Sequence, residues 1–384
     1  MSYILNISTA VPEFKIEKED MVRFYSQAIA PEETTPYLIK KLNFLSKKTK
    51  INSRYSCIPD YNGNEQELHT GGNYKQPVEK RMEVYRKKIM PLAAKAIDKL
   101  LIQTGVKPRD VTHLITVSCT GLTAPGFEFL VAEHYELQHA EKLAINFLGC
   151  YAAIKALKHA HYIAQANPNA CILIVSAELC SLHFYPAVSD EDVIANLLFA
   201  DGAAAVIVCG KENKHIKNKV VLAIDSIGSA YIPNTLELMT WNISSSAFRM
   251  YLNKNIAKVI KENIEPVVKI FLSDNSSEID HWAIHPGGIS IIEAVKESLH
   301  LTESNVAESM STMQEFGNMS SPTILFILNK IFHKIKNSGE PDNKKIFSCA
   351  FGPGLSIEMI HLTSVDKTPI SKSKYIPEKY AVQV

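Results

Sequence analysis

The stretch LGCYAAIKAL (148–157) places a cysteine directly after a glycine, where an apolar run gives way to a helical pattern. The preceding run, LAINF (143–147), has the composition of a short buried strand. Because glycine permits a tight turn between a strand and a helix, we expect the side chain of Cys150 at the helix N-terminus. Unpaired N–H groups there favour an anion, so Cys150 is either a nucleophile or a small buried hydrophobe.

The composition of the chain indicates a large globular protein and argues against several other classes of protein. It has 384 residues, of which 46% are hydrophobic and 21% charged, enough for a large core shared by two similar lobes. A formal net charge of +1 gives no reason to expect a nucleic-acid or membrane partner. The seven cysteines are scattered and contain no CxxC pair, which argues against a disulfide framework or a zinc site. With no signal peptide and no apolar run of membrane-spanning length, we predict a cytoplasmic protein.

Strand-like and helix-like segments alternate from residue 111 onward. The predicted strands are VTHLITVSC (111–119), KLAINF (142–147), CILIVSAE (171–178), AAAVIVC (203–209) and VVLAIDSIG (220–228). A helical pattern at 150–166 separates the second strand from the third, and charged helices are predicted before residue 111, at 17–29, 36–50 and 78–101. This alternation predicts an α/β fold with largely buried strands. Proline and serine in the tail, residues 363–380, predict a loosely held C-terminus.

The second half of the chain resembles the first. HWAIHPGG (281–288) is a strand followed by a glycine turn, as is LITVSCTG (114–121). Thirty-three residues after His285 (318 − 285) comes Gly-Asn and an apolar helix, and thirty-two residues after Ser118 (150 − 118) comes Gly-Cys and another. A repeat on this scale predicts two related lobes, residues 1–219 with the cysteine and 220–384 with a histidine and an asparagine.

Two residues of the second lobe complement Cys150. His285 leaves the end of the strand WAI at a Pro-Gly-Gly turn, and Asn318 follows Gly317 and is expected to open a helix. Either could be purely structural, as a packed histidine or a helix N-cap. If the lobes are related by pseudo-symmetry, however, Cys150 and Asn318 occupy equivalent helix ends that face one crevice, with His285 beside them.

Two reaction classes use such a trio. Papain-like proteases have the same residue order, and the separation of 135 residues (285 − 150) fits them, but their flanking signature is missing here. The other class is decarboxylative Claisen condensation of thioesters. It needs a thiolate to carry an acyl group and neutral donors, such as His285 and Asn318, to stabilise an enolate oxygen.

Five segments make the sequence resemble the type III polyketide synthases, the chalcone synthase-like group of the thiolase superfamily. They are GCYAA around Cys150, LFADGAAAV (198–206), WAIHPGG (282–288), FGNMSSPTILFIL (316–328) and FGPGLSIE (351–358). Related ketoacyl synthase III enzymes carry HQAN in place of HPGG. The resemblance implies a five-layered αβαβα thiolase-like fold, a homodimer and a catalytic triad of Cys150, His285 and Asn318. It also implies coenzyme A thioesters as substrates and no cofactor or metal.

The resemblance also suggests which residues line the substrate cavity. Phe199 matches a phenylalanine beside the triad, and Met250 stands where plant enzymes have a second gating phenylalanine. Trp241 falls near the expected cavity floor, where plant enzymes have a small residue. Cys119 is expected to line the cavity or to pack in the core, and Ser320, within GNMSS, is expected to contact substrate. The segment 239–252 looks more like bacterial members of the family.

Other positions match contacts outside the cavity. Ala124, before Pro125-Gly126, matches the residue that reaches into the partner subunit's pocket. Lys41 and Lys48 align with basic residues that bind coenzyme A at the tunnel mouth, although Phe44 stands where another basic residue is expected. A solvated helix face would explain the same lysines.

The predicted function is therefore iterative condensation of malonyl-CoA onto an acyl-CoA starter held on Cys150, followed by cyclisation to a pyrone, resorcinol or related product. Two alternatives remain at this point. One is a ketoacyl synthase III-like enzyme that performs a single condensation, and the other is a non-catalytic protein that retains the thiolase fold.

Overall fold

The computed structural model describes residues 1–29, 35–63, 65–273 and 278–368. In these residues the helices are α1 (Lys18–Ala28), α2 (Pro36–Lys48), α3 (Val78–Thr104), α4 (Phe127–His134), α5 (Ala152–Ala166), α6 (Asp190–Leu198), α7 (Ile256–Leu272), α8 (Ile289–Ser298), α9 (Ala307–Phe316) and α10 (Thr323–Lys336). The strands are β1 (Ser2–Ala10), β2 (Phe14–Glu17), β3 (Ser53–Ser56), β4 (His113–Ser118), β5 (Glu141–Asn146), β6 (Cys171–Leu179), β7 (Asp201–Gly210), β8 (Val220–Tyr231), β9 (Met239–Ile243), β10 (Phe248–Leu252), β11 (His281–Ile284), β12 (Lys345–Gly352) and β13 (Ser356–Asp366).

Nine of the described strands form one hydrogen-bonded sheet in the order β11-β12-β13-β8-β1-β7-β6-β4-β5. Its two halves repeat one pairing pattern. In the first half β4 pairs parallel with β6, and the pairs β6–β7 and β7–β1 are antiparallel. In the second half β11 pairs parallel with β12, and the pairs β12–β13 and β13–β8 are antiparallel. The halves are joined where β1 pairs with β8 over Ser2–Ile4. The predicted α/β class and the strands of both halves are confirmed.

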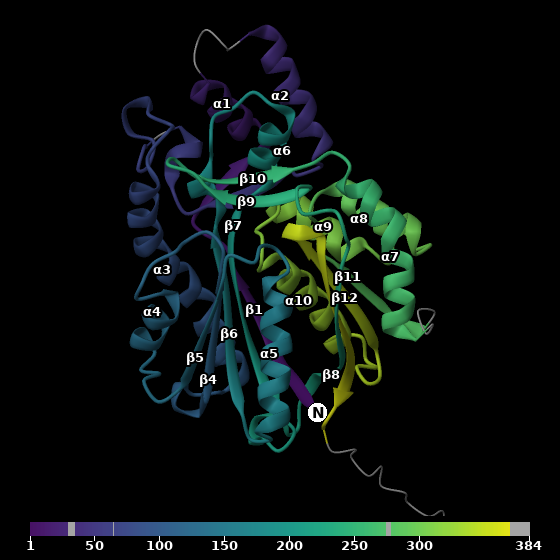
Figure 1. Ribbon diagram of the computed structural model, residues 1–384. Helices are drawn as coiled ribbons and strands as arrows, with labels where there is room; N and C mark the ends of the chain where they lie inside the picture. The colour runs from purple at the N-terminus through teal and green to yellow at the C-terminus, as the bar shows by residue number, and fades with distance from the viewer. Residues whose placement is uncertain (30–34, 64, 274–277, 369–384) are drawn as a thin grey trace, which may run out of the picture.

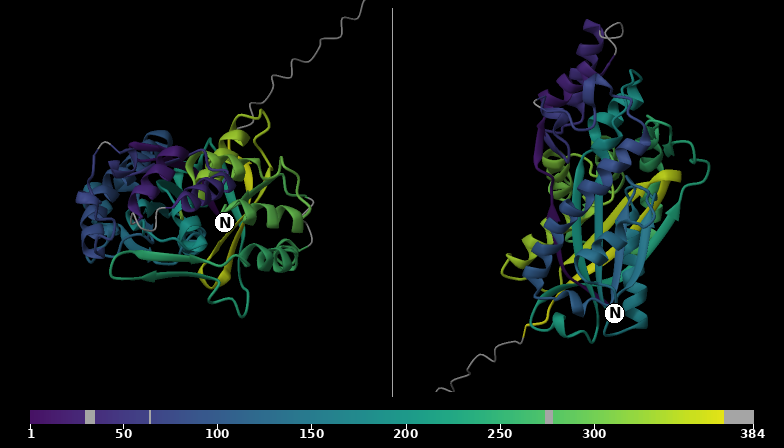
Figure 2. Two further views of the ribbon diagram at one scale, coloured as in Figure 1. Left: turned by 90° about the horizontal axis from the view of Figure 1, so that it is seen from above. Right: turned by 90° about the vertical axis from the view of Figure 1, so that its left-hand side faces the viewer.

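Five layers result from the alternation of side chains along these strands. On β6, the side chains of Leu173 and Val175 pack in a hydrophobic cluster with residues of α3. Those of Ile172 and Ile174 point to the other face, where a second cluster includes residues of α5 and α10. The second cluster also includes residues of β12 and β13, so α5 and α10 lie between the two halves of the sheet. The opposite face of β12 and β13 packs on α7 and α8. The outer helices therefore stand at opposite sides of the molecule (Figures 1 and 2).

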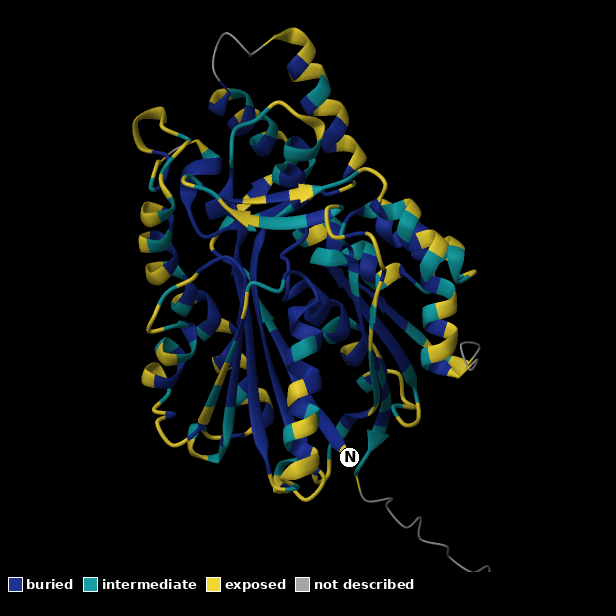
Figure 3. Ribbon diagram, in the orientation of Figure 1, coloured by how far each residue is buried: buried dark blue, intermediate teal, exposed yellow. Residues whose placement is uncertain are grey.

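Burial follows these layers. The sheet strands and the inner helices are mostly buried, whereas α3 and α7 expose their outer faces (Figure 3). None of the helices in the described ranges is both long and apolar enough to cross a membrane.

Two sequence predictions differ from the structure at the chain ends. The segment Ser2–Ala10, examined only as a candidate signal peptide, is the strand β1 near the middle of the sheet. The predicted start of the loosely held tail, residue 363, is too early in the sequence, because residues 363–366 complete β13 through pairing with β8. The remainder of that tail, from 369, lies outside the described residues.

The carboxyl ends of β4, β6 and β11 are followed by Cys119, Cys180 and His285. The hairpin β9–β10 and helices α1, α2 and α6 gather at one end of the sheet (Figure 1). Ligands of α/β proteins bind beyond the carboxyl ends of strands, so the functional site is expected at this end.

A buried ionic cluster fastens α5 to β13. The carboxylate of Glu358 lies 2.8 Å from Lys155 Nζ and 2.7 Å from Lys158 Nζ, and Ser229 Oγ also donates to it. The Glu358 side chain is 2% exposed and that of Lys158 is 8% exposed. Removal of one partner would leave a buried charge uncompensated, which costs far more than an exposed pair contributes.

We expect Glu358→Gln to lower the free energy of unfolding by about 3 kcal/mol, because it leaves the buried Lys158 without its counter-ion. The matched control is Glu262→Gln, which breaks an exposed pair with Lys258 and should cost less than about 0.5 kcal/mol. Denaturant unfolding of both variants measures the difference. Equal losses would contradict the account of this cluster.

Candidate active site

Cys150 lies in the turn between β5 and α5, two residues before the helix begins at Ala152. Gly149 has φ of 86°, a conformation that favours glycine, and a Cβ there would lie 2.6 Å from Pro353 Cδ. The Ala152 N–H donates to Gly149 O, which closes the turn. The cysteine is 5% exposed. The Gly-Cys sequence therefore brings the thiol to the entrance of α5.

The prediction that Asn318 opens a helix is wrong, because α10 begins five residues later, at Thr323. Pro322 disfavours helical geometry in the residue before it, so the helix starts only after the proline. Asn318 instead forms an isolated strand bridge with Phe199. Its N–H donates to Leu198 O at 2.9 Å, and its carbonyl accepts the Ala200 N–H at 2.9 Å.

The structure nevertheless brings Asn318 to Cys150. The Cys150 Sγ lies 4.0 Å from Asn318 Oδ1 and 3.7 Å from Ser320 Oγ. Asn318 Oδ1 also accepts the Ser320 N–H at 2.8 Å. Because this bond engages the amide oxygen, the amide NH₂ of Asn318 remains available as a donor.

His285 follows β11, and its N–H donates to Cys349 O at 2.9 Å. The residue is fully buried, and within the described residues neither ring nitrogen has a hydrogen-bond partner. Its turn lies close to the bridge of Asn318, since a Cβ on Gly288 would be 3.9 Å from Leu198 Cδ1. Buried polar groups are normally paired, and His285 shares this unpaired state with the buried His69, so both of its ring nitrogens are free to bond a ligand of the site.

Burial determines the charge states of the thiol and the imidazole. It raises the pKa of Cys150 to about 12, an effect opposed by the hydrogen bonds to Ser320 and Asn318. It lowers the pKa of His285 to about 3. Both groups are therefore neutral in this arrangement. A thiolate–imidazolium pair would oppose both shifts, because each charge would gain a counter-ion.

Glu178, whose carboxyl group is buried near Cys150, was not predicted from the sequence to belong to the site. It accepts hydrogen bonds from Cys119 N–H at 2.8 Å, Thr120 Oγ1 at 2.7 Å and Ser321 Oγ at 2.5 Å. Burial raises its pKa to about 7, opposed by these bonds. A single acid at the end of the apolar run CILIVSAE was the available signal.

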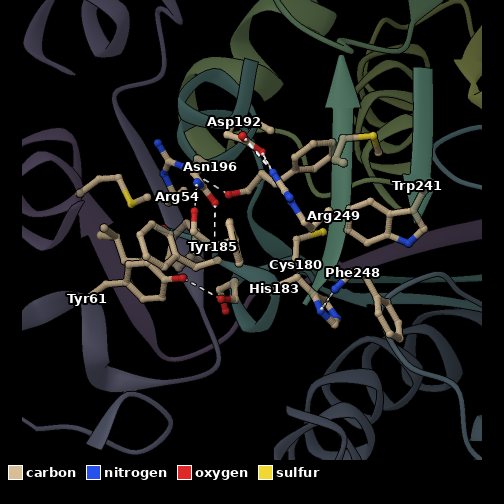
Figure 4. A pocket seen from close by; sticks show the side chains of 18 residues that line it. Arg54, Tyr61, Cys180, His183, Tyr185, Asp192, Asn196, Trp241, Phe248 and Arg249 are labelled. Carbon is tan, nitrogen blue, oxygen red and sulfur yellow. Dashed lines mark hydrogen bonds and ion pairs between the residues drawn. The ribbon is translucent and has the colours of Figure 1, made fainter. Parts of the chain in front are cut away.

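A pocket adjoins this cluster (Figure 4). Phe199, Trp241 and Met250 line it, and Met250 is the cross-strand partner of Trp241 in the β9–β10 hairpin. The Trp241 indole N–H donates to Cys119 O at 3.0 Å, which fixes the ring. Cys150 and Asn318 are not among the lining residues. Phe199 connects the two places, since its side chain lines the pocket and its backbone bridges to Asn318.

Two further residues that line the pocket were not predicted from the sequence. Arg54 reaches it from β3. His183 stacks on Phe248 with ring centroids 4.3 Å apart and accepts the Phe248 N–H at its Nδ1. Its Nε2–H donates to Thr120 O at 2.7 Å, so the imidazole is held at both nitrogens.

Comparison with known proteins identifies the family. Residues 1–212 match the N-terminal domain of chalcone and stilbene synthases, and residues 223–366 match their C-terminal domain. The chain belongs to the chalcone and stilbene synthase family. It is a type III polyketide synthase, an acyltransferase with the thiolase-like fold.

Relatives from plants, brown algae and Dictyostelium match nearly the whole chain. The chain is 25% identical to type III polyketide synthase A of Arabidopsis thaliana over 94% of its own length and 92% of that protein. The structure of PKS-I from the brown alga Ectocarpus siliculosus is similar with a TM-score of 0.87 at 26% identity, covering 95% of this chain and 98% of that one. The C-terminal type III polyketide synthase domain of the Dictyostelium hybrid Steely1 gives 0.85 at 26% identity, covering 95% and 99%.

The remaining predicted residues of this polyketide synthase lie outside the pocket. Ala124 is exposed in the loop before α4. Lys41 forms an ion pair with Asp190 at the start of α6 and donates to Val188 O at 2.8 Å. The Lys48 ammonium lies 5.0 Å from the centre of the Phe44 ring. Their roles at the subunit interface and in coenzyme A binding stay predictions.

We expect His285→Ala to change the pH dependence of Cys150 alkylation by iodoacetamide. Burial leaves the Cys150 thiol neutral unless a cation approaches it, and His285 is the residue proposed to supply that charge, so in the variant the thiolate should form only as pH rises above the usual cysteine range. The wild-type enzyme should react readily near pH 6 through a thiolate–imidazolium pair, whereas the variant should react slowly there and faster up to about pH 10. Identical profiles would exclude His285 as the partner of the thiol.

Proposed function

We propose that Cys150, His285 and Asn318 catalyse iterative, decarboxylative condensation of malonyl-CoA onto an acyl-CoA starter. The observation that carries this proposal is that Asn318 and Ser320, from the second half of the chain, reach the buried thiol of Cys150 in the first half. Cys150 Sγ lies 4.0 Å from Asn318 Oδ1, and the bond from Ser320 N–H leaves the asparagine NH₂ to donate. A site whose free hydrogen-bonding groups are donors stabilises the oxygen of an enolate and would not stabilise a cation.

Loading begins when the Cys150 thiolate attacks the thioester carbonyl of the starter. A new carbon–sulfur bond forms at Cys150, the bond to coenzyme A breaks, and the imidazolium of His285 protonates the leaving thiolate. The buried imidazole then returns to the neutral form that its lowered pKa favours. A neutral imidazole carries one N–H and can serve as a donor in the next step.

Malonyl-CoA then loses carbon dioxide. The carbon–carbon bond to its carboxylate breaks, and the electron pair passes into an enolate whose oxygen accepts hydrogen bonds from His285 and Asn318. The enolate carbon attacks the Cys150 thioester, a carbon–carbon bond forms, and the thiolate leaves. The chain, now two carbons longer on coenzyme A, reloads for another cycle, and cyclisation gives a pyrone, resorcinol or related product.

The same proposal covers the assembly and the compartment. We propose a homodimer, supported by the exposure of Ala124, which resembles the family's residue at the partner's pocket. A reducing, cytoplasmic compartment is supported by seven buried cysteines, all free and all within the described ranges.

Cys150→Gln and Asn318→Ala should separate decarboxylation of malonyl-CoA from condensation on the thiol. The glutamine amide resembles an acyl group, so Cys150→Gln should still decarboxylate malonyl-CoA while forming no polyketide. Asn318→Ala removes an enolate donor and should slow decarboxylation on the order of a hundredfold, with Cys150 alkylation nearly unchanged. Release of carbon dioxide and mass spectrometry of products measure both outcomes. Chain-extended product from Cys150→Gln would contradict the nucleophile, and normal decarboxylation by Asn318→Ala would contradict the donor.

We also propose aliphatic starters, because Trp241 fills part of the pocket and is fixed by its bond to Cys119 O. Met250 adapts its shape more readily than an aromatic gate would. Hexanoyl-CoA should therefore be preferred to p-coumaroyl-CoA, and Trp241→Gly should admit the bulkier starter or extend the product. A wild-type preference for p-coumaroyl-CoA, with an unchanged profile in Trp241→Gly, would contradict this view of the pocket.

A further inference from the structure

Arg54 is a buried cation without a carboxylate partner among the described residues. It lies on β3 opposite Ile16 and is 5% exposed. Burial lowers its pKa to about 10, which still leaves the guanidinium charged at neutral pH. Burial of an unpaired charge is costly, so a chain retains one where its hydrogen bonds serve a specific purpose.

The hydrogen bonds of Arg54 converge on the end of α6. Its Nη1 donates to Asn196 O at 3.1 Å and to Phe199 O at 3.2 Å. The last carbonyls of a helix lack intrahelical partners, and a cation there also complements the helix dipole. Arg54 therefore fixes the backbone at the point where the chain leaves α6 and enters the bridge with Asn318.

Arg54 also contacts the other side of that bridge. A Cβ on Gly317 would lie 3.6 Å from Arg54 Cβ and 3.1 Å from Leu198 O. Gly317 has φ of 69°, so the backbone before Asn318 approaches Arg54 and Leu198 as only glycine readily allows. The arginine thus packs on both chain segments whose pairing sets the position of Asn318.

We infer that Arg54 is a positioning residue for the decarboxylation step, acting through Phe199 on Asn318. This inference rests on the proposed function of Asn318 as an enolate donor. The guanidinium holds Phe199 O, and the adjoining Leu198 O and Ala200 N–H hold the backbone of Asn318. Loss of the guanidinium would let the bridge shift and move the donor away from the enolate, while the thiol in the turn before α5 would keep its place. A shift of about 1 Å in a catalytic group can cost a hundredfold in rate.

The test compares two reactions of the full-length enzyme. We expect Arg54→Met to lower kcat for conversion of malonyl-CoA to acetyl-CoA by about tenfold or more with little change in KM. Alkylation of Cys150 by iodoacetamide should stay within about twofold, because Asn318 comes after Ser320 among the hydrogen bonds that lower the pKa of the thiol. In the double variant with Asn318→Ala, the arginine change should cost nothing further, because its route to catalysis is already lost.

Arg81 offers a matched control, since it is a fully buried arginine that donates to the carbonyls of Leu182, Gln76 and Tyr74. Arg81→Met should lower stability without selectively slowing decarboxylation. If Arg54→Met fails to fold, Arg54→Lys replaces it, because lysine retains the charge but not the planar fork, and at least about a threefold loss in decarboxylation is expected.

The outcomes separate this inference from the proposed function. Normal decarboxylation by Asn318→Ala would overturn the proposed function itself. A slow Asn318→Ala enzyme beside a normal Arg54 variant would overturn only the role of Arg54. Equal losses of decarboxylation and alkylation in Arg54→Met, matched by Arg81→Met, would show a merely structural arginine and also overturn it.

Discussion

The backbone bridge between Phe199 and Asn318 is the contact on which the geometry of the site depends. Phe199 follows α6 in the first half of the chain, and Asn318 lies shortly after α9 in the second. Two hydrogen bonds of 2.9 Å, from Asn318 N–H to Leu198 O and from Ala200 N–H to Asn318 O, connect them. Through this bridge the asparagine of one half reaches the cysteine of the other.

The layers around the bridge bury the three residues that are proposed to catalyse the reaction. Helices α5 and α10 are packed between the two halves of the sheet, and Cys150, His285 and Asn318 are each at least 95% buried. Burial opposes charge on both the thiol and the imidazole, so they gain from ionising only as a pair. In the proposed reaction, exclusion of water would also strengthen hydrogen bonds from neutral donors to an enolate.

Sequence patterns were sufficient where local rules decide the structure. Gly149 before Cys150 predicted the turn into α5, and the apolar runs predicted the strands on both sides of it. They were insufficient where distant contacts decide. Strand β1 was missed because Asn6 and Ser8 interrupt its apolar run, and their polar groups are satisfied by Gln103 and Ala96 far along the chain.

The errors at the site have similar causes. Asn318 was expected to open a helix by analogy with Cys150, but Pro322 delays α10 and leaves the asparagine in an extended bridge. Arg54 stands in a polar stretch, INSRYS, where nothing marks it as buried. Its partners are backbone carbonyls, which any sequence would supply.

If Cys150 carries the growing chain, the acyl-enzyme can be captured on this residue. The wild-type protein is incubated with a starter acyl-CoA, digested and mapped by mass spectrometry before and after a chase with malonyl-CoA. We expect one acyl adduct, on the peptide that contains Cys150, and it should disappear in the chase as extended product forms. An adduct on another cysteine, or product formation with Cys150 never acylated, would contradict this role of Cys150.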